Sequence, residues 1–329
     1  MEGMTVQRIS INEIEDFRIG NAQDLEGGTG CTVILCDEGM AAGLDIRGGG
    51  PASRESGLLE PRASAQAIHG LVLSGGSAFG LGAAGGVMDY FKERGIGFDT
   101  GIAKIPLVCQ SDIFDLGVGS PDAYPDPAMA YAACLDAEKN EPKSGNVGAG
   151  IGATVGKIKG PSRMMKSGLG IYAVALGEFK MGAIVSVNAL GDIYDSDTGR
   201  KLAGLLNADH TGFEDSCQAM YTLTETTHGM PMGNTTIGAI ITNGRFNKVQ
   251  LGKIASMAHN GMARAIRPVH TSMDGDSIYA LSRGAVTVDE DVAGTLAADV
   301  MAWAIADAVL SATPLYGLKT AKEILLKWT

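Results

Sequence analysis

The chain carries its most informative segment at Gly233-Asn234-Thr235-Thr236-Ile237-Gly238-Ala239-Ile240-Ile241-Thr242-Asn243. β-Branched and apolar residues dominate this segment after its first two positions, which predicts a β-strand that begins with a hydroxyl residue. A Thr in this place matters most if the peptide bond before it is cut. Its hydroxyl can attack the carbonyl carbon of Asn234, pass through an ester and leave Thr235 as a new chain terminus.

A chain-terminal Thr235 would carry both a nucleophile and a base. Its α-amine, with a reference pKa of about 7.7–8.0, would lie beside its own hydroxyl. This arrangement defines an N-terminal-nucleophile hydrolase, with Asn234 and Thr235 flanking the autocleavage bond. The alternative hypothesis is that Thr235 only begins a strand, as Thr often does.

The composition indicates a compact globular protein. The 329 residues include 47 glycines, and the hydrophobic and charged fractions are 45% and 19%. Such a chain is long enough to bury a large core, and its glycines indicate close backbone packing and many turns. The net charge of −11 leaves no basic stripe for phosphates, so we expect no nucleic-acid partner.

The cysteines and the N-terminus indicate a reducing compartment. The five cysteines form no C-x-x-C pair and are odd in number, which argues against a disulfide framework or a structural zinc site. No signal peptide and no run of eighteen apolar residues is found. We therefore expect a cytoplasmic protein without membrane contact.

Segments with strand-like and helix-like apolar patterns alternate along the chain without a repeat period, which predicts a mixed α/β class. No composition shift marks a boundary, so a single domain over 1–329 is expected. The expected strands span 31–36, 41–47, 69–74, 172–176, 182–188, the segment from 235, and 277–281, and the expected helices span 77–94, 121–139, 249–266, 292–310 and 318–328.

Gly80, Gly82 and Gly85 satisfy the G-x-G-x-x-G pattern of dinucleotide-binding proteins. The first glycine of that pattern belongs in the turn that leaves the strand, and here Gly75 and Gly76 occupy that turn. A dinucleotide-binding oxidoreductase is therefore kept only as an alternative. The segment 75–77, which ends at Ser77, is instead expected to offer backbone N–H groups to a substrate carboxylate or an oxyanion.

The remaining polar candidates have ordinary explanations as well as functional ones. Asp274 and Asp276, separated by one glycine, form a carboxylate pair or a plain Asp-Gly turn, and two carboxylates are too few to hold a divalent metal. Lys157 ends a glycine-rich run that lacks the order of a phosphate loop, and such a lysine is more often solvated than catalytic. We expect neither a metal nor an organic cofactor.

Five spaced motifs together resemble a known family. They are 73–81 (LSGGSAFGL), 148–157 (GAGIGATVGK), 183–192 (AIVSVNALGD), 234–237 (NTTI) and 270–276 (HTSMDGD). The chain is similar in these motifs to the L-aminopeptidase/D-esterase group of peptidases, and most similar to its nylon-oligomer hydrolase branch (6-aminohexanoate-oligomer endohydrolases). The likeness covers most of the chain after residue 25.

The resemblance implies an αββα sandwich, self-cleaved into an α fragment, 1–234, and a β fragment, 235–329. It implies Thr235 as the nucleophile, Asp274 and Asp276 as its acidic neighbours, Lys157 as a supporting group and Asn188 as an oxyanion donor. It also implies a homo-oligomer of αβ units, commonly a tetramer.

The resemblance also implies the substrate class. The expected activity is hydrolysis of small peptides or polyamide oligomers through an acyl-Thr intermediate. Action on N-terminal amino acids, as an aminopeptidase or D-esterase, is the alternative, and an uncleaved, idle binding protein with the same fold is a third. Phe114, expected to bind substrate, stands where the nylon-hydrolase branch has a Tyr, so one hydrogen-bond donor near the nucleophile is missing.

Overall fold

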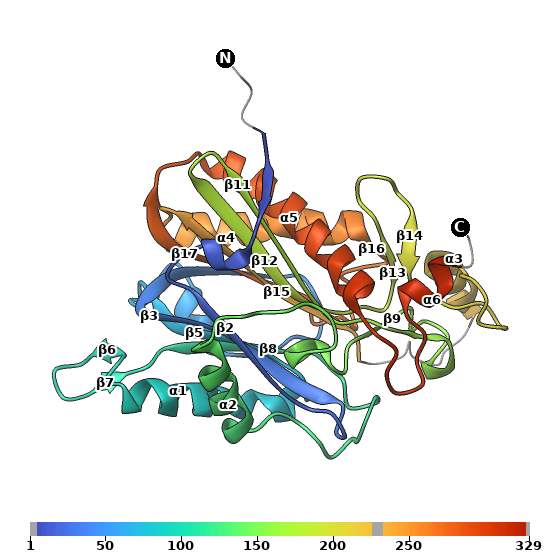
Figure 1. Ribbon diagram of the computed structural model, residues 1–329, viewed down its shortest axis with the longest axis horizontal. Helices are drawn as coiled ribbons and strands as arrows, with labels where there is room; N and C mark the ends of the chain where they lie inside the picture. The colour runs from blue at the N-terminus through green and yellow to red at the C-terminus, as the bar shows by residue number, and fades with distance from the viewer. Residues whose placement is uncertain (1–4, 226–232, 327–329) are drawn as a thin grey trace.

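The computed structural model describes residues 5–225 and 233–326, and it folds into four layers (Figure 1). Two β-sheets lie face to face in the middle, and a pair of helices covers the outer face of each. Helices α4 (Lys248–Ala265) and α5 (Glu290–Ser311) cover one sheet, and helices α1 (Ala84–Glu93) and α2 (Pro127–Ala137) cover the other. The predicted αββα sandwich is therefore confirmed.

The first sheet carries the Thr235 strand at its centre. Its order is β1 (Gln7–Ile9), β11 (Leu169–Leu176), β12 (Phe179–Asn188), β15 (Thr235–Gly244), β17 (Ser277–Val286) and the second half of β3 (Thr29–Ile46). Strand β15 pairs antiparallel with β12 and parallel with β17, so both of its edges are hydrogen-bonded. The second sheet consists of β2 (Arg18–Asp24), the first half of β3, β5 (Ile68–Ser74), β8 (Val108–Asp112) and β4 (Ala52–Arg54).

Strand β3 belongs to both sheets. Its first half pairs with β5 from Cys31 to Leu35, and its second half pairs with β17 from Ala41 to Ile46. The prediction of two separate strands over 31–36 and 41–47 is therefore wrong. Gly39, whose φ of +79° lies in the left-handed region, lets the chain bend between the two halves without ending the strand.

Each layer boundary has its own apolar core. Alternate residues of β15 divide between two of these cores, as strand geometry requires. Ile237, Ala239 and Ile241 lie in the cluster between the sheets, whereas Ile240 lies in the cluster under α4 and α5. Thr235 shares its side of the strand with Ile237, so its side chain points into the space between the sheets at their open end.

The observed helices are close to the predicted ones, with shifted ends. Helix α4 is capped by Asn247, whose side chain accepts a hydrogen bond from the backbone N–H of Gln250, while the Gln250 side chain accepts one from the backbone N–H of Asn247. The predicted helix over 77–94 is split into a 3₁₀ turn, Ser77–Gly82, and α1, and the one over 318–328 shortens to α6 (Ala321–Leu325). Helix α5 is long and apolar enough to cross a membrane, but it packs on β11, β12 and α4 as a core helix does.

The remaining short elements border the two sheets. They are β6 (Phe98–Asp99), β7 (Lys104–Ile105), β9 (Thr154–Val155), β10 (Met165–Lys166), β13 (Asp192–Tyr194), β14 (Lys201–Ala203), β16 (Ile266–Arg267) and α3 (Ser216–Tyr221).

Candidate active site

The Thr235 hydroxyl lies against the carbonyl group that it is predicted to attack. Its Oγ1 donates to the carbonyl oxygen of Asn234, and the backbone N–H of Gly275 donates to the same oxygen over 3.1 Å. A Cβ on Gly275 would lie 2.9 Å from Thr235 Oγ1, so only glycine lets the 274–276 turn approach this closely. Both residues flanking the predicted cut are buried. The carbonyl therefore already has a donor where a tetrahedral oxyanion would form.

Asp274 and Asp276 lie beside the 234–236 segment, on the turn that leads into β17, and they differ in unfilled hydrogen-bonding capacity. Asp276 accepts the N–H of Thr236 on one oxygen, over 2.7 Å, and both the N–H and the Nδ1 of His270 on the other, over 3.2 and 2.8 Å. Asp274 accepts the N–H of Thr271 on Oδ2, over 2.6 Å, and its buried Oδ1 has no partner among the described residues. Of the two carboxyl groups, Asp274 therefore has the greater unfilled accepting capacity.

Burial changes the protonation behaviour of Asp274. Both carboxylates are 2% exposed. Burial, with a smaller contribution from the Asp276 charge, raises the pKa of Asp274 to about 6. A carboxyl group with such a pKa exchanges protons near neutral pH, which suits a general base.

Lys157 and Asn188 hold the chain one residue before the predicted cut. Lys157 Nζ donates to the carbonyl oxygen of Gly233 over 2.9 Å and to the backbone and side-chain oxygens of Asn188 over 3.1 and 2.5 Å. Asn188 Nδ2 reaches the carbonyl of Gly233 over 3.4 Å and that of Phe114 over 2.9 Å. Asn188 also lies opposite Thr235 in the pairing of β12 with β15.

These contacts change two expectations. Lys157 is buried, so the interpretation of a solvated lysine is wrong. Burial lowers its pKa to about 7, against the opposing charges of Asp274, Asp115 and Asp276. Asn188, expected as an oxyanion donor, contacts the Gly233 carbonyl, and the donor at the Asn234 carbonyl is the N–H of Gly275. The role of Asn188 in turnover stays a prediction.

Phe114 lines a small cavity of about 90 Å³ that opens beside Gly233. Its ring packs so close to Gly233 that a Cβ there would lie 2.4 Å from it. Val118, Pro161 and Met164 supply other apolar walls, and Lys157 is the one charged residue in the lining formed by the described parts of the chain. The cavity therefore favours an uncharged, apolar chain.

The 75–77 segment does not offer the free N–H groups that the sequence predicted. The N–H of Gly75 donates to Gly30 O, that of Gly76 to Asp115 Oδ1 over 2.7 Å, and that of Ser77 to Ile113 O. The three backbone N–H groups expected to bind an anion therefore already donate to acceptors of the same chain. The segment instead anchors Asp115, a buried carboxyl group whose pKa burial raises to about 6.

The G-x-G-x-x-G glycines do not lie where a dinucleotide-binding turn requires them. Gly80 and Gly82 lie inside the 3₁₀ turn and Gly85 in the first turn of α1, after the strand-to-helix turn that a dinucleotide would need. A Cβ on Gly80 would lie 2.0 Å from the carbonyl oxygen of Gly75. Close backbone approach therefore explains this glycine, and the oxidoreductase alternative is not supported.

Sequence reasoning missed three groups of this site: Gly275, Asp115 and His270. Gly275 and His270 stand inside the 270–276 motif and Asp115 lies outside the five motifs, and the role of each depends on contacts that the folded chain creates. No cluster of three or more His, Cys, Asp or Glu side chains able to hold a metal ion occurs in the described ranges 5–225 and 233–326.

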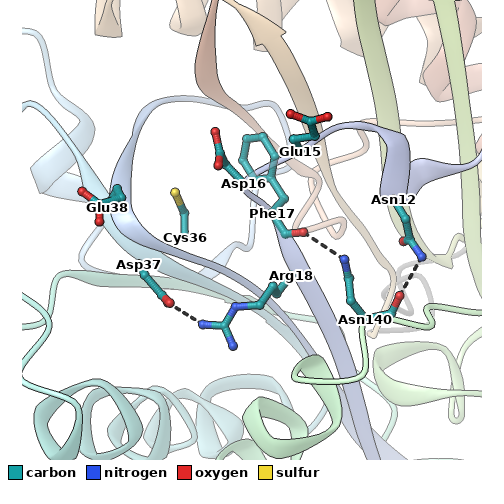
Figure 2. A pocket seen from close by; sticks show the side chains of 9 residues that line it. All are labelled: Asn12, Glu15, Asp16, Phe17, Arg18, Cys36, Asp37, Glu38 and Asn140. Carbon is teal, nitrogen blue, oxygen red and sulfur yellow. Dashed lines mark hydrogen bonds and ion pairs between the residues drawn. The ribbon is translucent and has the colours of Figure 1, made fainter.

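A larger, open pocket lies at the other end of the sandwich (Figure 2). It holds about 420 Å³ and is lined by Asn12, Glu15, Asp16, Phe17, Arg18, Cys36, Asp37, Glu38 and Asn140. Its four carboxylates are exposed, and Asp16 faces Arg283 in the distal half of β17. We use the name acidic pocket for this set of residues.

The chain matches one protein family over nearly its full length. The model of peptidase family S58 matches residues 3–323. An uncharacterized aminopeptidase of Mycobacterium tuberculosis is 34% identical over 347 residues, covering 96% of this chain and 97% of the relative. A 6-aminohexanoate-oligomer endohydrolase of Paenarthrobacter ureafaciens is 35% identical over 315 residues, covering 89% and 83%.

Solved structures share the fold at low sequence identity. The L-aminopeptidase D-Ala-esterase/amidase of Ochrobactrum anthropi, described as a variant of the N-terminal-nucleophile hydrolase fold, superposes with a TM-score of 0.70 at 16% identity, covering 97% of this chain and 94% of that one. A Burkholderia β-aminopeptidase superposes with a TM-score of 0.64 at 16% identity, covering 95% and 91%.

Proposed function

Because this amide hydrolase belongs to peptidase family S58, we propose that it activates itself by cutting the Asn234–Thr235 bond and then uses Thr235 as its nucleophile. The observation that carries the proposal is the meeting of Thr235 Oγ1 and the Gly275 N–H at the Asn234 carbonyl. The attacking hydroxyl and the oxyanion donor are thus both in place before any substrate arrives.

Self-cleavage proceeds in two steps. The Thr235 oxygen attacks the Asn234 carbonyl carbon, and Asp274 takes the hydroxyl proton on its free oxygen. The C–N bond then breaks, the proton passes to the leaving nitrogen, and Asn234 is left as an ester on Thr235. Water hydrolyses the ester and releases the Asn234 carboxylate. Because β15 is hydrogen-bonded on both edges, the fragments 1–234 and 235–329 stay in one fold.

Substrate turnover repeats this chemistry with a new acyl group. Thr235 attacks the substrate amide, the amine leaves with a proton, and water resolves the acyl-Thr ester. The freed α-amine and Asp274 are the available bases, and the Gly275 N–H stabilises the oxyanion. Each step is an acyl transfer to the Thr235 oxygen or to water, so Thr235, Asp274 and Gly275 supply the nucleophile, a base and the oxyanion donor that the reaction requires.

The natural substrate is proposed to be an amide inside a chain. In the precursor, Lys157 and Asn188 bind the Gly233 carbonyl, which lies one residue before the attacked one. A substrate acylated on its amine offers a carbonyl in that place, whereas a free N-terminal amino acid does not. Among the described residues, no carboxylate lines the cavity beside Gly233 to receive a free ammonium group. These contacts favour endohydrolysis of peptides or oligoamides over aminopeptidase action.

Mass analysis of purified protein tests the proposal. Wild type is expected to separate under denaturing conditions into fragments that begin at Met1 and Thr235. Thr235→Ser keeps a hydroxyl and should still cleave, whereas Thr235→Ala should stay at full length and inactive. A full-length wild type after prolonged incubation, or cleavage that persists in Thr235→Ala, contradicts the proposal and favours the idle binding protein or an external protease.

Paired substrates test the preference for interior amides. N-acetylasparagine p-nitroanilide should be cleaved with a kcat/KM about tenfold or more above that of unblocked asparagine p-nitroanilide, the scale of a lost hydrogen bond to a charged group. A preference for the unblocked substrate would favour the aminopeptidase alternative. Tetrameric assembly and a cytoplasmic location stay predictions, and light scattering on the eluting protein measures the first.

A further inference from the structure

His270 lies behind the nucleophile in a clamp that the proposed reaction does not use. Its backbone N–H and its Nδ1 both reach Asp276 Oδ2, while Asp276 Oδ1 accepts the N–H of Thr236. Asp276 therefore ties the residue that follows the nucleophile to the loop before β17. An ionised carboxylate only accepts hydrogen bonds, so His270 Nδ1 carries the hydrogen.

A second histidine supports the ring of His270. The rings of His259 and His270 meet edge to face with centroids 4.7 Å apart. His259 is fully buried on α4, and its Nε2 lies 3.0 Å from the backbone carbonyl oxygen of Asp45. Because a carbonyl only accepts, Nε2 carries the hydrogen of that ring. Burial lowers the pKa of His259 to about 4, so it packs against His270 as a neutral ring at neutral pH.

The backbone of His270 matches this role. Its φ of +58° lies in the left-handed region, which histidine, asparagine and glycine tolerate better than most residues. This conformation aims both the N–H and the side chain of one residue at the same carboxylate oxygen. The buried Nε2 of His270 has no partner within the described parts of the chain.

We propose that His270 is a positioning residue, which acts through Asp276 to fix the Thr236 N–H and thereby the direction of the Thr235 hydroxyl. This inference rests on the proposed role of Thr235 as the nucleophile. It also assigns the carboxylates different roles, because Asp276, with three donors, holds the strand, whereas Asp274 accepts the proton. Small errors in the placement of a nucleophile cost rate rather than binding, so the effect belongs in kcat.

Substitution of His270 by glycine and by asparagine tests the inference. His270→Gly removes the ring without backbone strain and should lower kcat about 10- to 100-fold with little change in KM, and slow self-cleavage similarly. His270→Asn tolerates the same φ and offers an amide N–H near the place of Nδ1, so it should recover to within about threefold of wild type. Wild-type kcat in His270→Gly, or a failure of asparagine to rescue in a protein with an unchanged melting temperature, overturns the inference.

A double-substitution cycle separates positioning from a general structural role. If His270 acts through Asp276, His270→Gly combined with Asp276→Asn should be no slower than Asp276→Asn alone. If the fold-losses in kcat of the two single variants multiply in the double variant, the inference is overturned, even where one variant is less stable. Thr235→Ala measured in the same series identifies a failure of the proposed function itself, because wild-type rates in that variant remove the nucleophile from which both claims start.

Discussion

Carboxylates lie at both ends of the sandwich, and those at the two ends differ in burial and in hydrogen bonding. At the Thr235 end, Asp274 and Asp276 are buried, and each accepts backbone N–H groups. In the acidic pocket, Asp37 is exposed and pairs with Arg18, as Figure 2 shows. The acidic pocket has about 420 Å³ of space, and the cavity beside Gly233 has about 90 Å³.

In the proposed mechanism, reactivity follows burial and unfilled hydrogen-bonding capacity rather than acidity or pocket size. A carboxylate in water already has its solvation, so it gains little from a neighbour. The Asp274 carboxyl group has lost that solvation, and its buried Oδ1 has no hydrogen-bond partner among the described residues. Four predictions test this contrast, beginning with the largest expected effect.

Asp274→Asn should slow amide hydrolysis by a factor of about one hundred or more, because the amide cannot take the proton from Thr235. Asp37→Asn makes the same chemical change at the exposed end and should leave the rate unchanged. The measurement is steady-state hydrolysis of a blocked p-nitroanilide and of a linear 6-aminohexanoate oligomer, beside thermal melts. Equal rates in the two variants would remove the contrast between the ends.

Lys157→Met should reduce kcat/KM by about 10- to 100-fold, because the Gly233 carbonyl position and Asn188 lose a charged donor. Lys248 provides a matched control, since it is also buried and also donates to three backbone carbonyls, those of Leu58, Glu60 and Ala63. Lys248→Met should cost comparable stability but keep the activity of each folded molecule. Thermal melts measured with the kinetics distinguish the two outcomes, and an equal loss of activity in both would assign Lys157 a structural role only.

The sequence predicted the layers of this fold better than the contacts at its site. Periodicity identified the long helices and central strands because their apolar residues recur at helix or strand spacing, as in α4 and β15. It divided β3 at Gly39, because local patterns do not tell a bend from an end. The resemblance placed Thr235, Asp274, Asp276, Lys157 and Asn188, and the structure brings these five together.

The missed groups share a physical reason. Gly275 acts through a backbone N–H, which no side-chain pattern reports. Asp115 acts through partners far along the chain, and His270 depends on an unusual φ. Neither property can be read from the spacing of residues in the sequence. The 75–77 segment fails in the opposite way, because its N–H groups looked free but are filled by acceptors from other loops.

The pH dependence should be bell-shaped with its maximum between about 6 and about 7. Asp274 must be ionised to accept a proton, and its raised pKa of about 6 makes activity fall as the pH drops through that value. Lys157 is charged below its lowered pKa of about 7, so its contact weakens as the pH rises through that value. Each limb should approach a tenfold change per pH unit.

The two substitutions above assign the limbs. Asp274→Asn should abolish the acidic limb of its residual activity, and Lys157→Met should abolish the basic limb. Because the two groups interact, the measured values describe the pair rather than either residue alone. A profile that is flat from pH 5 to pH 8 in the wild type would show that neither buried group titrates during turnover.

The smallest effect is expected in the acidic pocket. The Asp37→Asn substitution removes the Asp37 charge and breaks its ion pair with Arg18. The side chain of Asp37 is 46% exposed and that of Arg18 is 26% exposed. Exposed pairs contribute about 0–1 kcal/mol, since solvent screens the charges and the side chains lose freedom on pairing. The melting temperature should therefore change by less than about 3 °C, and the difference from wild type should shrink further in 1 M salt. A large, salt-independent loss of stability would show that the stability of this end also depends on a desolvated charge. The two ends would then differ only in their part in the proposed reaction.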